Sequence, residues 1–161
     1  MTREIFKNIF DNYFDAVRNY IYYRSGDNEL ATDIAQETFM RVWEKQMEAD
    51  PKKIKGLLFK IAGDLFVSSY RKKKTVTQFK LNTKPEISDQ SPQDILEFEE
   101  LKKSYEIALT KLPEKQRTVF LMSRMENLKY HEIADSLGLS QKAIEKRMTN
   151  ALATLKQILR N

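Results

Sequence analysis

The stretch KYHEIADSLGLSQKAIEKRM, residues 129–148, holds two amphipathic segments separated by a glycine. The small and apolar residues of the first segment share one helical face: Ile133, Ala134 and Leu137. Gly138 permits the left-handed backbone that turns the chain, and Ser140 can cap the segment that follows. Small, glycine and apolar residues at this spacing are typical of a helix-turn-helix, which we therefore predict here.

The second segment predicts an exposed polar face. Its apolar residues return to the core at helical spacing: Ile144, Met148, Ala151, Leu152, Leu155 and Ile158. The residues that must point outward are of types that can hydrogen-bond base edges: Gln141, Lys142, Glu145 and Lys146. Arg147, Thr149 and Asn150 are better placed for phosphates. We predict that this face enters a major groove, the alternative being the solvated side of a terminal helix.

The composition favours helices and excludes several catalytic classes. The chain has 161 residues, of which 32% are charged, and only four Gly and four Pro. It has no Cys and one His, so it lacks a thiol nucleophile, a disulfide and a His-pair zinc site. We expect an all-α protein of the cytoplasm, with neither a secretory signal nor a membrane span.

Charge is segregated along the chain. The net charge is −4 over residues 1–50, +7 over 51–74, −3 over 75–110 and +5 over 111–161. Two basic blocks separated by an acidic stretch suggest two sites for a polyanion.

Hydrophobic periodicity divides the chain into two helical domains joined by a linker. Helices are predicted over 3–24, over 27–45 and from about Lys53 to Lys74, which together make one bundle. The periodicity then fades, and Ser91-Pro92 has the residue types that begin a helix. The predicted parts are an N-terminal helical domain over 1–75, a flexible linker over 76–92 that is acidic towards its end, and a C-terminal domain over 93–161.

One helical face in the first domain carries polar residues at i, i+3, i+4 and one turn on: Asp33, Gln36, Glu37 and Arg41. Two carboxylates without further ligands nearby make a poor metal site. A solvated face or a docking site for a basic partner explains the pattern better.

Four motifs together carry a resemblance to a known family: AxDIAQETFxxVW (31–43), LLFKIAGDLFVSSYRKK (57–73), LPEKQRTVFLM (112–122) and the helix-turn-helix (130–155). The chain resembles a bacterial RNA polymerase sigma factor of the extracytoplasmic-function class over essentially its whole length. The resemblance implies a protein that directs core RNA polymerase to promoters, with no catalysis of its own, no cofactor, no metal and no small-molecule substrate.

The resemblance also implies residue roles. The polar face at Asp33, Gln36, Glu37 and Arg41 would dock the polymerase clamp helices. The helix-turn-helix would contact the −35 element. Cations interleaved with aromatic rings suit the holding of unstacked bases, and they would bind and melt the −10 element: Lys52, Lys53, Lys55, Lys60, Phe59, Phe66, Tyr70, Arg71, Lys72, Lys73 and Lys74. An anti-sigma factor, membrane-bound, is an expected partner.

Some residues depart from the pattern of the family. Asp64 stands where Asn is common, Ser68 where Asp is common, and Ala143 where Thr or Ser is usual. Glu145 adds a negative charge beside the groove. Residues 85–100 hold six acids and no bases, which suits either a nucleic-acid mimic in the polymerase cleft or a solubilising linker.

Three other hypotheses remain open from the sequence. The first is an ordinary helix-turn-helix regulator that binds DNA without polymerase. The second is a nucleic-acid enzyme with Asp33 and Glu37 as metal ligands, disfavoured because these residues and the basic block lie on different helices. The third is an interaction-only polymerase inhibitor.

Overall fold

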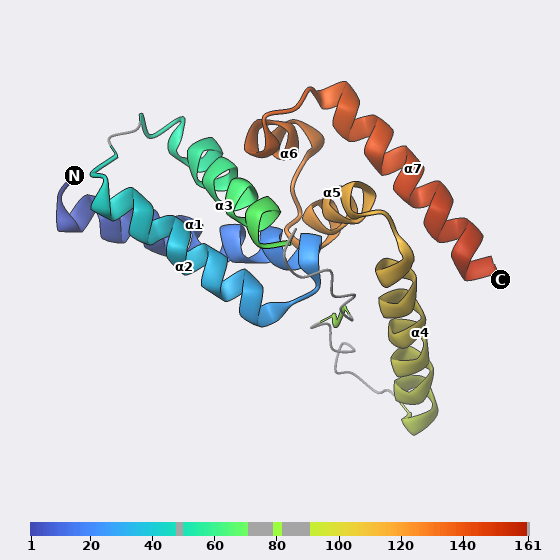
Figure 1. Cartoon of the computed structure of the whole chain (residues 1–161). Helices are drawn as coiled ribbons and strands as arrows, with labels where there is room; N and C mark the ends of the chain where they lie inside the picture. The colour runs from blue at the N-terminus through green and yellow to red at the C-terminus, as the bar shows by residue number, and fades with distance from the viewer. Residues whose placement is uncertain (48–49, 71–78, 82–90, 161) are drawn as a thin grey trace.

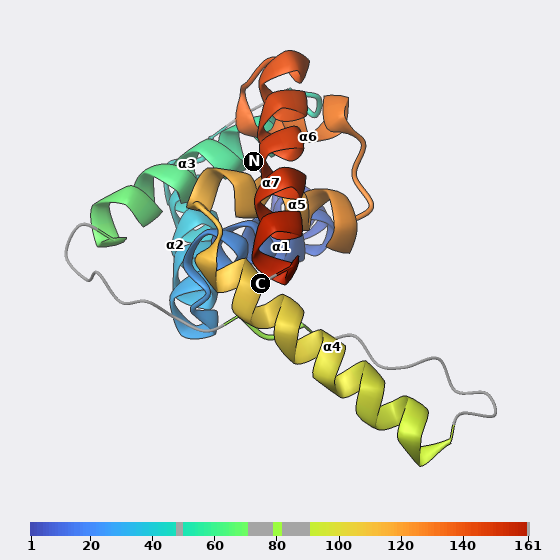
Figure 2. The ribbon, with the colours of Figure 1, turned by 90° about the vertical axis from the view of Figure 1, so that its right-hand side faces the viewer.

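The computed structural model describes residues 1–47, 50–70, 79–81 and 91–160, and the fold of these residues is all-α, as predicted. The described residues form seven helices: α1 (Arg3–Ser25), α2 (Asn28–Glu44), α3 (Ile54–Tyr70), α4 (Pro92–Lys111), α5 (Glu114–Met125), α6 (Tyr130–Leu137) and α7 (Gln141–Arg160). Helices α1 to α3 form one group, and α5 to α7 pack beside it (Figure 1). The N-terminal part of α4 projects away from this body (Figure 2).

The helices begin and end where local residue chemistry requires it. Gly26 follows α1 with φ 70°, and its N–H donates to the carbonyl of Tyr22 at 2.7 Å. Asp27 then caps α2 by accepting from the N–H of Leu30 at 3.1 Å. Ser91 caps α4 in the same way, with Pro92 as its first residue. Asn127, with φ 53°, lies just beyond the end of α5. The start of α4 at Ser91-Pro92 was predicted and is confirmed.

The core of the first group lies where α1 crosses α2 and α3. Its largest fully buried side chains include Phe39, Phe66, Ile21 and Leu58. Around Phe39 the rings of Phe6, Phe10 and Phe14 approach to centroid distances between 5.2 and 6.4 Å, which favours tilted and edge-on aromatic packing.

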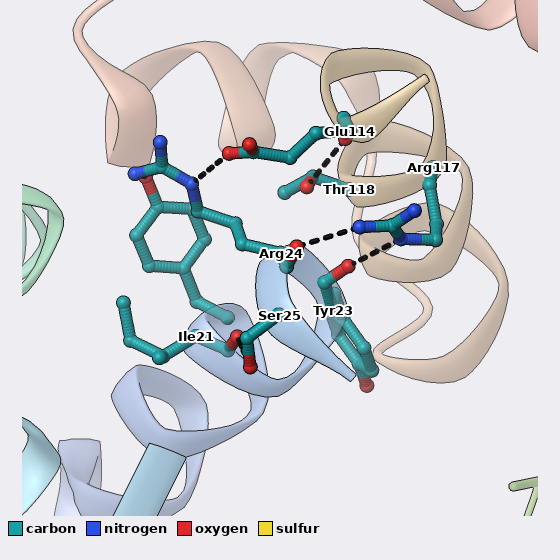
Figure 3. A network of polar contacts seen from close by, with 8 residues as sticks. Ile21, Tyr23, Arg24, Ser25, Glu114, Arg117 and Thr118 are labelled. Carbon is teal, nitrogen blue, oxygen red and sulfur yellow. Dashed lines mark hydrogen bonds and ion pairs between the residues drawn. The ribbon is translucent and has the colours of Figure 1, made fainter. Parts of the chain in front are cut away.

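Helix α5 connects the two groups, because it contacts α1 on one side and α7 on the other. Arg117 of α5 is only 8% exposed, and its guanidinium donates to the carbonyls of Tyr23 (2.8 Å) and Arg24 (2.6 Å) at the end of α1 (Figure 3). The last carbonyls of a helix have no intrahelical partner and carry partial negative charge. Arg117 therefore caps α1 from the other domain.

A reciprocal ion pair reinforces this contact. The side chain of Arg24 turns towards α5, where its Nε lies 2.5 Å from Oε1 of Glu114 (Figure 3). The domains are thus closed on each other in this structure, an arrangement that the sequence left open.

Parts of the predicted third helix and of the predicted linker lie outside the described residues. Helix α3 is described to Tyr70, so residues 71–74 of the predicted helix lie outside the described residues. Helix α4 begins at Pro92, as Ser91-Pro92 predicted, and it carries four of the six acids of residues 85–100: Asp94, Glu97, Glu99 and Glu100. Residues 76–78 and 82–90 of the predicted linker also lie outside the described residues.

Candidate nucleic-acid interface

The helix-turn-helix is built from α6, a three-residue turn and α7. Gly138 has φ 65°, and the N–H of Leu139 donates to the carbonyl of Ala134 at 3.0 Å. A Cβ at Gly138 would meet nothing within 4 Å, so the backbone conformation, not lack of space, requires glycine. Ser140 then accepts from the N–H of Ala143 at 3.2 Å and caps α7, as predicted.

The start of α6 is fixed by a carboxylate. The backbone N–H of Lys129 donates to Oε1 of Glu132 at 3.0 Å. This backbone hydrogen bond lowers the pKa of the Glu132 carboxyl below its usual range, because it favours the charged form. The contact satisfies a backbone donor at the start of α6.

The first two turns of α7 expose the predicted base-contacting face. Ile144 and Met148 are buried, whereas the four polar residues between and before them are exposed: Gln141, Lys142, Glu145 and Lys146. The amide of Gln141 lies 3.4 Å from the carboxylate of Glu145. An exposed polar face at the N-terminal end of the second helix is the surface that this motif inserts into a major groove.

The predicted phosphate-contacting residues divide into two groups. Thr149 and Asn150 are exposed on α7. Arg147 is half-buried and lies near α1. Burial raises the pKa of Tyr20 on that helix, and the positive charges of Arg24 and Arg147 oppose the shift. Arg147 is therefore near enough to α1 for its charge to act on Tyr20.

The basic block before and along α3 is only partly a free surface. Lys52, Lys53 and Lys60 are exposed, and Lys55 is half-buried. The side chain of Tyr70 and the predicted cations Arg71, Lys72, Lys73 and Lys74 lie outside the described residues.

The structure corrects the expectation for two aromatic residues. Phe59 and Phe66 were predicted to stack on bases, but they are 3% and 1% exposed. Tyr20 packs against Phe59 with ring centroids 5.0 Å apart, and the Arg24 guanidinium covers Phe66. Both covering residues belong to α1, so these rings are core residues of the first domain. Their spacing to Leu58 and Ala62, which widens the apolar stripe of α3, was the signal for burial.

A cleft of about 570 Å³ between α3 and α6 was not foreseen from the sequence. Gly56, Lys60, Gly63 and Asp64 line its α3 side, and residues 135–138 line its α6 side. Asp64, which stands where Asn is common in the family, thus faces the helix-turn-helix in this arrangement.

The predicted polymerase-docking face lies on the outer side of α2. Its four residues are all exposed: Asp33, Gln36, Glu37 and Arg41. Arg41 pairs with Glu37 at 3.1 Å. Beside them is an apolar hollow of about 620 Å³, lined among others by Phe6, Phe10, Met40 and Trp43. Met40 is 54% exposed, and the sequence analysis did not single it out.

Among the described residues, no group of three or more His, Asp or Glu side chains is arranged to hold a metal ion. None of the described helices combines the length and the apolar character of a membrane span.

Known proteins resemble this chain in sequence and in fold. The sigma-70 region 2 family matches residues 9–76, and the sigma-70 region 4 family matches residues 104–155. The ferric citrate uptake sigma factor FecI of Escherichia coli is 30% identical over 76% of this chain and 72% of its own length. The extracytoplasmic-function (ECF) sigma factor SigM of Bacillus subtilis is 26% identical over 93% of this chain and 92% of its own length.

Other relatives are longer or more distant. The chain spans 58% of the ECF sigma factor SigE of Mycolicibacterium smegmatis, to which it is 27% identical. In fold, it matches the sigma factor RpoE of Bartonella quintana, solved with the anti-sigma factor NepR, at a TM-score of 0.64 and 21% identity over 98% of both chains. The chain belongs to the sigma-70 family of RNA polymerase sigma factors, in its extracytoplasmic-function class.

Proposed function

We propose that three exposed surfaces carry the three binding functions of a sigma factor. Helix α2 binds core polymerase, the lysines around α3 bind the −10 element, and α7 binds the −35 element. As a member of this family, the chain directs core RNA polymerase to promoters. The observation that best supports the division is the exposed polar face of α7, which follows a glycine turn in a chain that also carries the polar face of α2.

The α7 face contacts the −35 element in this proposal. Lys142 and Lys146 have the donors that guanine acceptors take, Gln141 suits adenine, and Glu145 can accept from cytosine. Thr149, Asn150 and Arg147 contact the DNA backbone.

Core polymerase docks on α2. The exposed Asp33, Gln36 and Glu37 offer acceptors to a basic partner helix, and Arg41 is held in place by Glu37. The adjacent hollow between Phe10 and Met40 can take an apolar side chain of the same partner.

The −10 element is bound by the lysines around α3, with Lys52, Lys53 and Lys60 on phosphates. Phe59 and Phe66 are left out of this role because they are buried. Strand opening is driven by binding energy from extruded bases, which requires no covalent chemistry, so we propose no enzymatic activity. We also propose an anti-sigma partner, since RpoE was solved in complex with one.

Run-off transcription tests the function. The purified chain is added to core polymerase on genomic fragments, and transcript starts are mapped. Defined start sites that need both components are expected. Their absence, with tight and specific duplex binding by the chain alone, would instead favour the ordinary helix-turn-helix regulator.

The docking face has its own matched pair of variants. Asp33→Ala removes an exposed acceptor of the docking face and should weaken polymerase binding. Glu29→Ala removes an equally exposed acid from the first turn of α2, outside the docking face, and should leave binding unchanged.

A further inference from the structure

Three residues from the segment between the domains lie against both of them. Phe79 is 4% exposed, with its ring centroid 5.7 Å from that of Tyr22 on α1. The hydroxyl of Tyr22 accepts from the N–H of Lys80 at 2.9 Å, and Glu106 of α4 accepts from the N–H of Leu81 at 2.8 Å. The segment is thus anchored to α1 on one side and to α4 on the other.

Phe79 covers the residue that joins the two domains. The guanidinium of Arg117 lies 4.4 Å from the centroid of the Phe79 ring, while its N–H groups donate to the last carbonyls of α1. A ring over the guanidinium adds a cation–π attraction and excludes water. Hydrogen bonds to the α1 carbonyls are stronger in this water-poor setting than they would be in solvent.

Further polar contacts join α1 to residues at the two ends of α5, around Arg117. Glu126 accepts from the side chains of Asn19 and Tyr23, each at 2.7 Å. Arg24 and Glu114 form the ion pair described above. Asn19, Tyr23, Phe79 and Glu126 share the lining of one hollow of about 390 Å³, so the linker anchor and the Glu126 contacts adjoin each other.

The closed arrangement restricts the DNA-binding surfaces. Helix α6 lies against α3, and a Cβ on Gly56 would be 3.9 Å from the carbonyl oxygen of Asp135. Lys60 and Asp64 of α3 therefore lie across this cleft from the helix-turn-helix. These side chains and the polar face of α7 remain exposed, so the closed contact restricts the position of the two surfaces relative to each other, which changes only when the domains separate.

We propose that Arg117, Glu126 and Glu114 form a latch that holds the free chain closed, with Phe79 of the linker as its cover. Withdrawal of Phe79 exposes Arg117 to water, weakens its bonds to the α1 carbonyls and lets the domains part. A partner that takes up the linker thereby opens the chain. The identification of that partner as core polymerase rests on the proposed function, but the latch itself does not.

Distance measurements on the free chain test the latch. Because the chain has no cysteine, Asn8→Cys and Gln157→Cys place spin labels at two exposed positions, one in each domain. Double electron–electron resonance should give one narrow distance distribution for the otherwise unchanged chain. Phe79→Ala should add a broad population at longer distances.

Lys80→Ala is the matched control, since it changes the neighbouring exposed side chain and leaves the backbone contacts of Lys80 in place. It should keep the narrow distribution. The latch is overturned if Phe79→Ala gives the same distribution as the unchanged chain, or if Lys80→Ala broadens it to the same extent.

Glu126→Ala provides a second test should Phe79→Ala fail to fold by circular dichroism. It removes the acceptor for Asn19 and Tyr23 and leaves the buried side chains of both cores in place, so longer distances are expected again. A narrow distribution for folded Glu126→Ala would also count against the latch. Addition of core polymerase to the unchanged chain should then produce the long distances, and binding without separation would contradict the release step.

Discussion

The guanidinium of Arg24 lies 4.5 Å from the centroid of the Phe66 ring, and its Nη1 donates to the hydroxyl of Tyr20 at 3.0 Å. Arg24 thus covers a ring of α3 while its Nε pairs with Glu114 of α5. One side chain of α1 therefore links the core of the first domain to the contact between domains.

Phe66→Ala should destabilise the protein, because it leaves a cavity in a site that is 1% exposed. The expected loss in free energy of unfolding is about 3–5 kcal/mol, measured by urea denaturation followed by circular dichroism. Phe66→Leu fills more of the space and should cost less. If Phe66→Ala keeps normal stability and loses only promoter opening, the original hypothesis of base stacking is right.

The contrast between the helix ends and Phe66 shows what the sequence can predict. Gly138 and Ser91 act on their own neighbours within a few residues, so the turn and the helix start that they determine were predicted. The apolar spacing along α3 signals the burial of Phe66 but not its cover by Arg24, and the role of Arg117 depends on carbonyls 93 and 94 positions away. A charged residue in a polar stretch has no local signal for burial, and only the tertiary fold supplies its partners.

Gly138→Ala should destabilise the helix-turn-helix by about 1–2 kcal/mol, because a residue with a side chain adopts φ 65° only at a cost in steric energy. Thermal unfolding measures this loss. Gly56→Ala is the control: this glycine lies inside α3, and an added Cβ makes only an ordinary contact at 3.9 Å. Alanine there should be neutral or stabilising by up to about 1 kcal/mol. Equal losses at the two positions would contradict a conformational role for Gly138.

Tyr23 should make stability depend on pH in the alkaline range. Burial raises the pKa of its hydroxyl above the ordinary value, and the hydrogen bond to Glu126 raises it further; Tyr22 also raises it, and Arg18 opposes. The folded state thus holds the proton more tightly than the unfolded state. The stabilisation is complete below the unfolded pKa of about 10 and declines as pH rises above it, by at most about 1.4 kcal/mol per pH unit.

Tyr23→Phe isolates this contribution. Phenylalanine has no hydroxyl proton to lose at this position. The free energy of unfolding of the variant should therefore fall less between pH 9 and pH 11, a range that spans roughly one unit either side of the reference pKa of tyrosine. At neutral pH it should be less stable by about 1 kcal/mol, because a buried hydrogen bond is lost. Urea denaturation across this range gives both values, and parallel pH profiles for the two proteins would refute the assignment to Tyr23.

Lys142→Ala should lower transcription in a promoter-dependent way. Lys142 is exposed at the N-terminal end of α7, and a lysine bound to guanine acceptors contributes about 1–3 kcal/mol of discrimination. We expect roughly a tenfold or greater loss at promoters with the cognate base pair, and a much smaller one where that pair is changed. Lys156→Ala removes an exposed lysine further along the same helix and should affect all promoters little. Run-off transcription on a set of −35 variants measures both. A uniform loss across the set would instead mean that Lys142 contacts the phosphate backbone, because such contacts carry no sequence information.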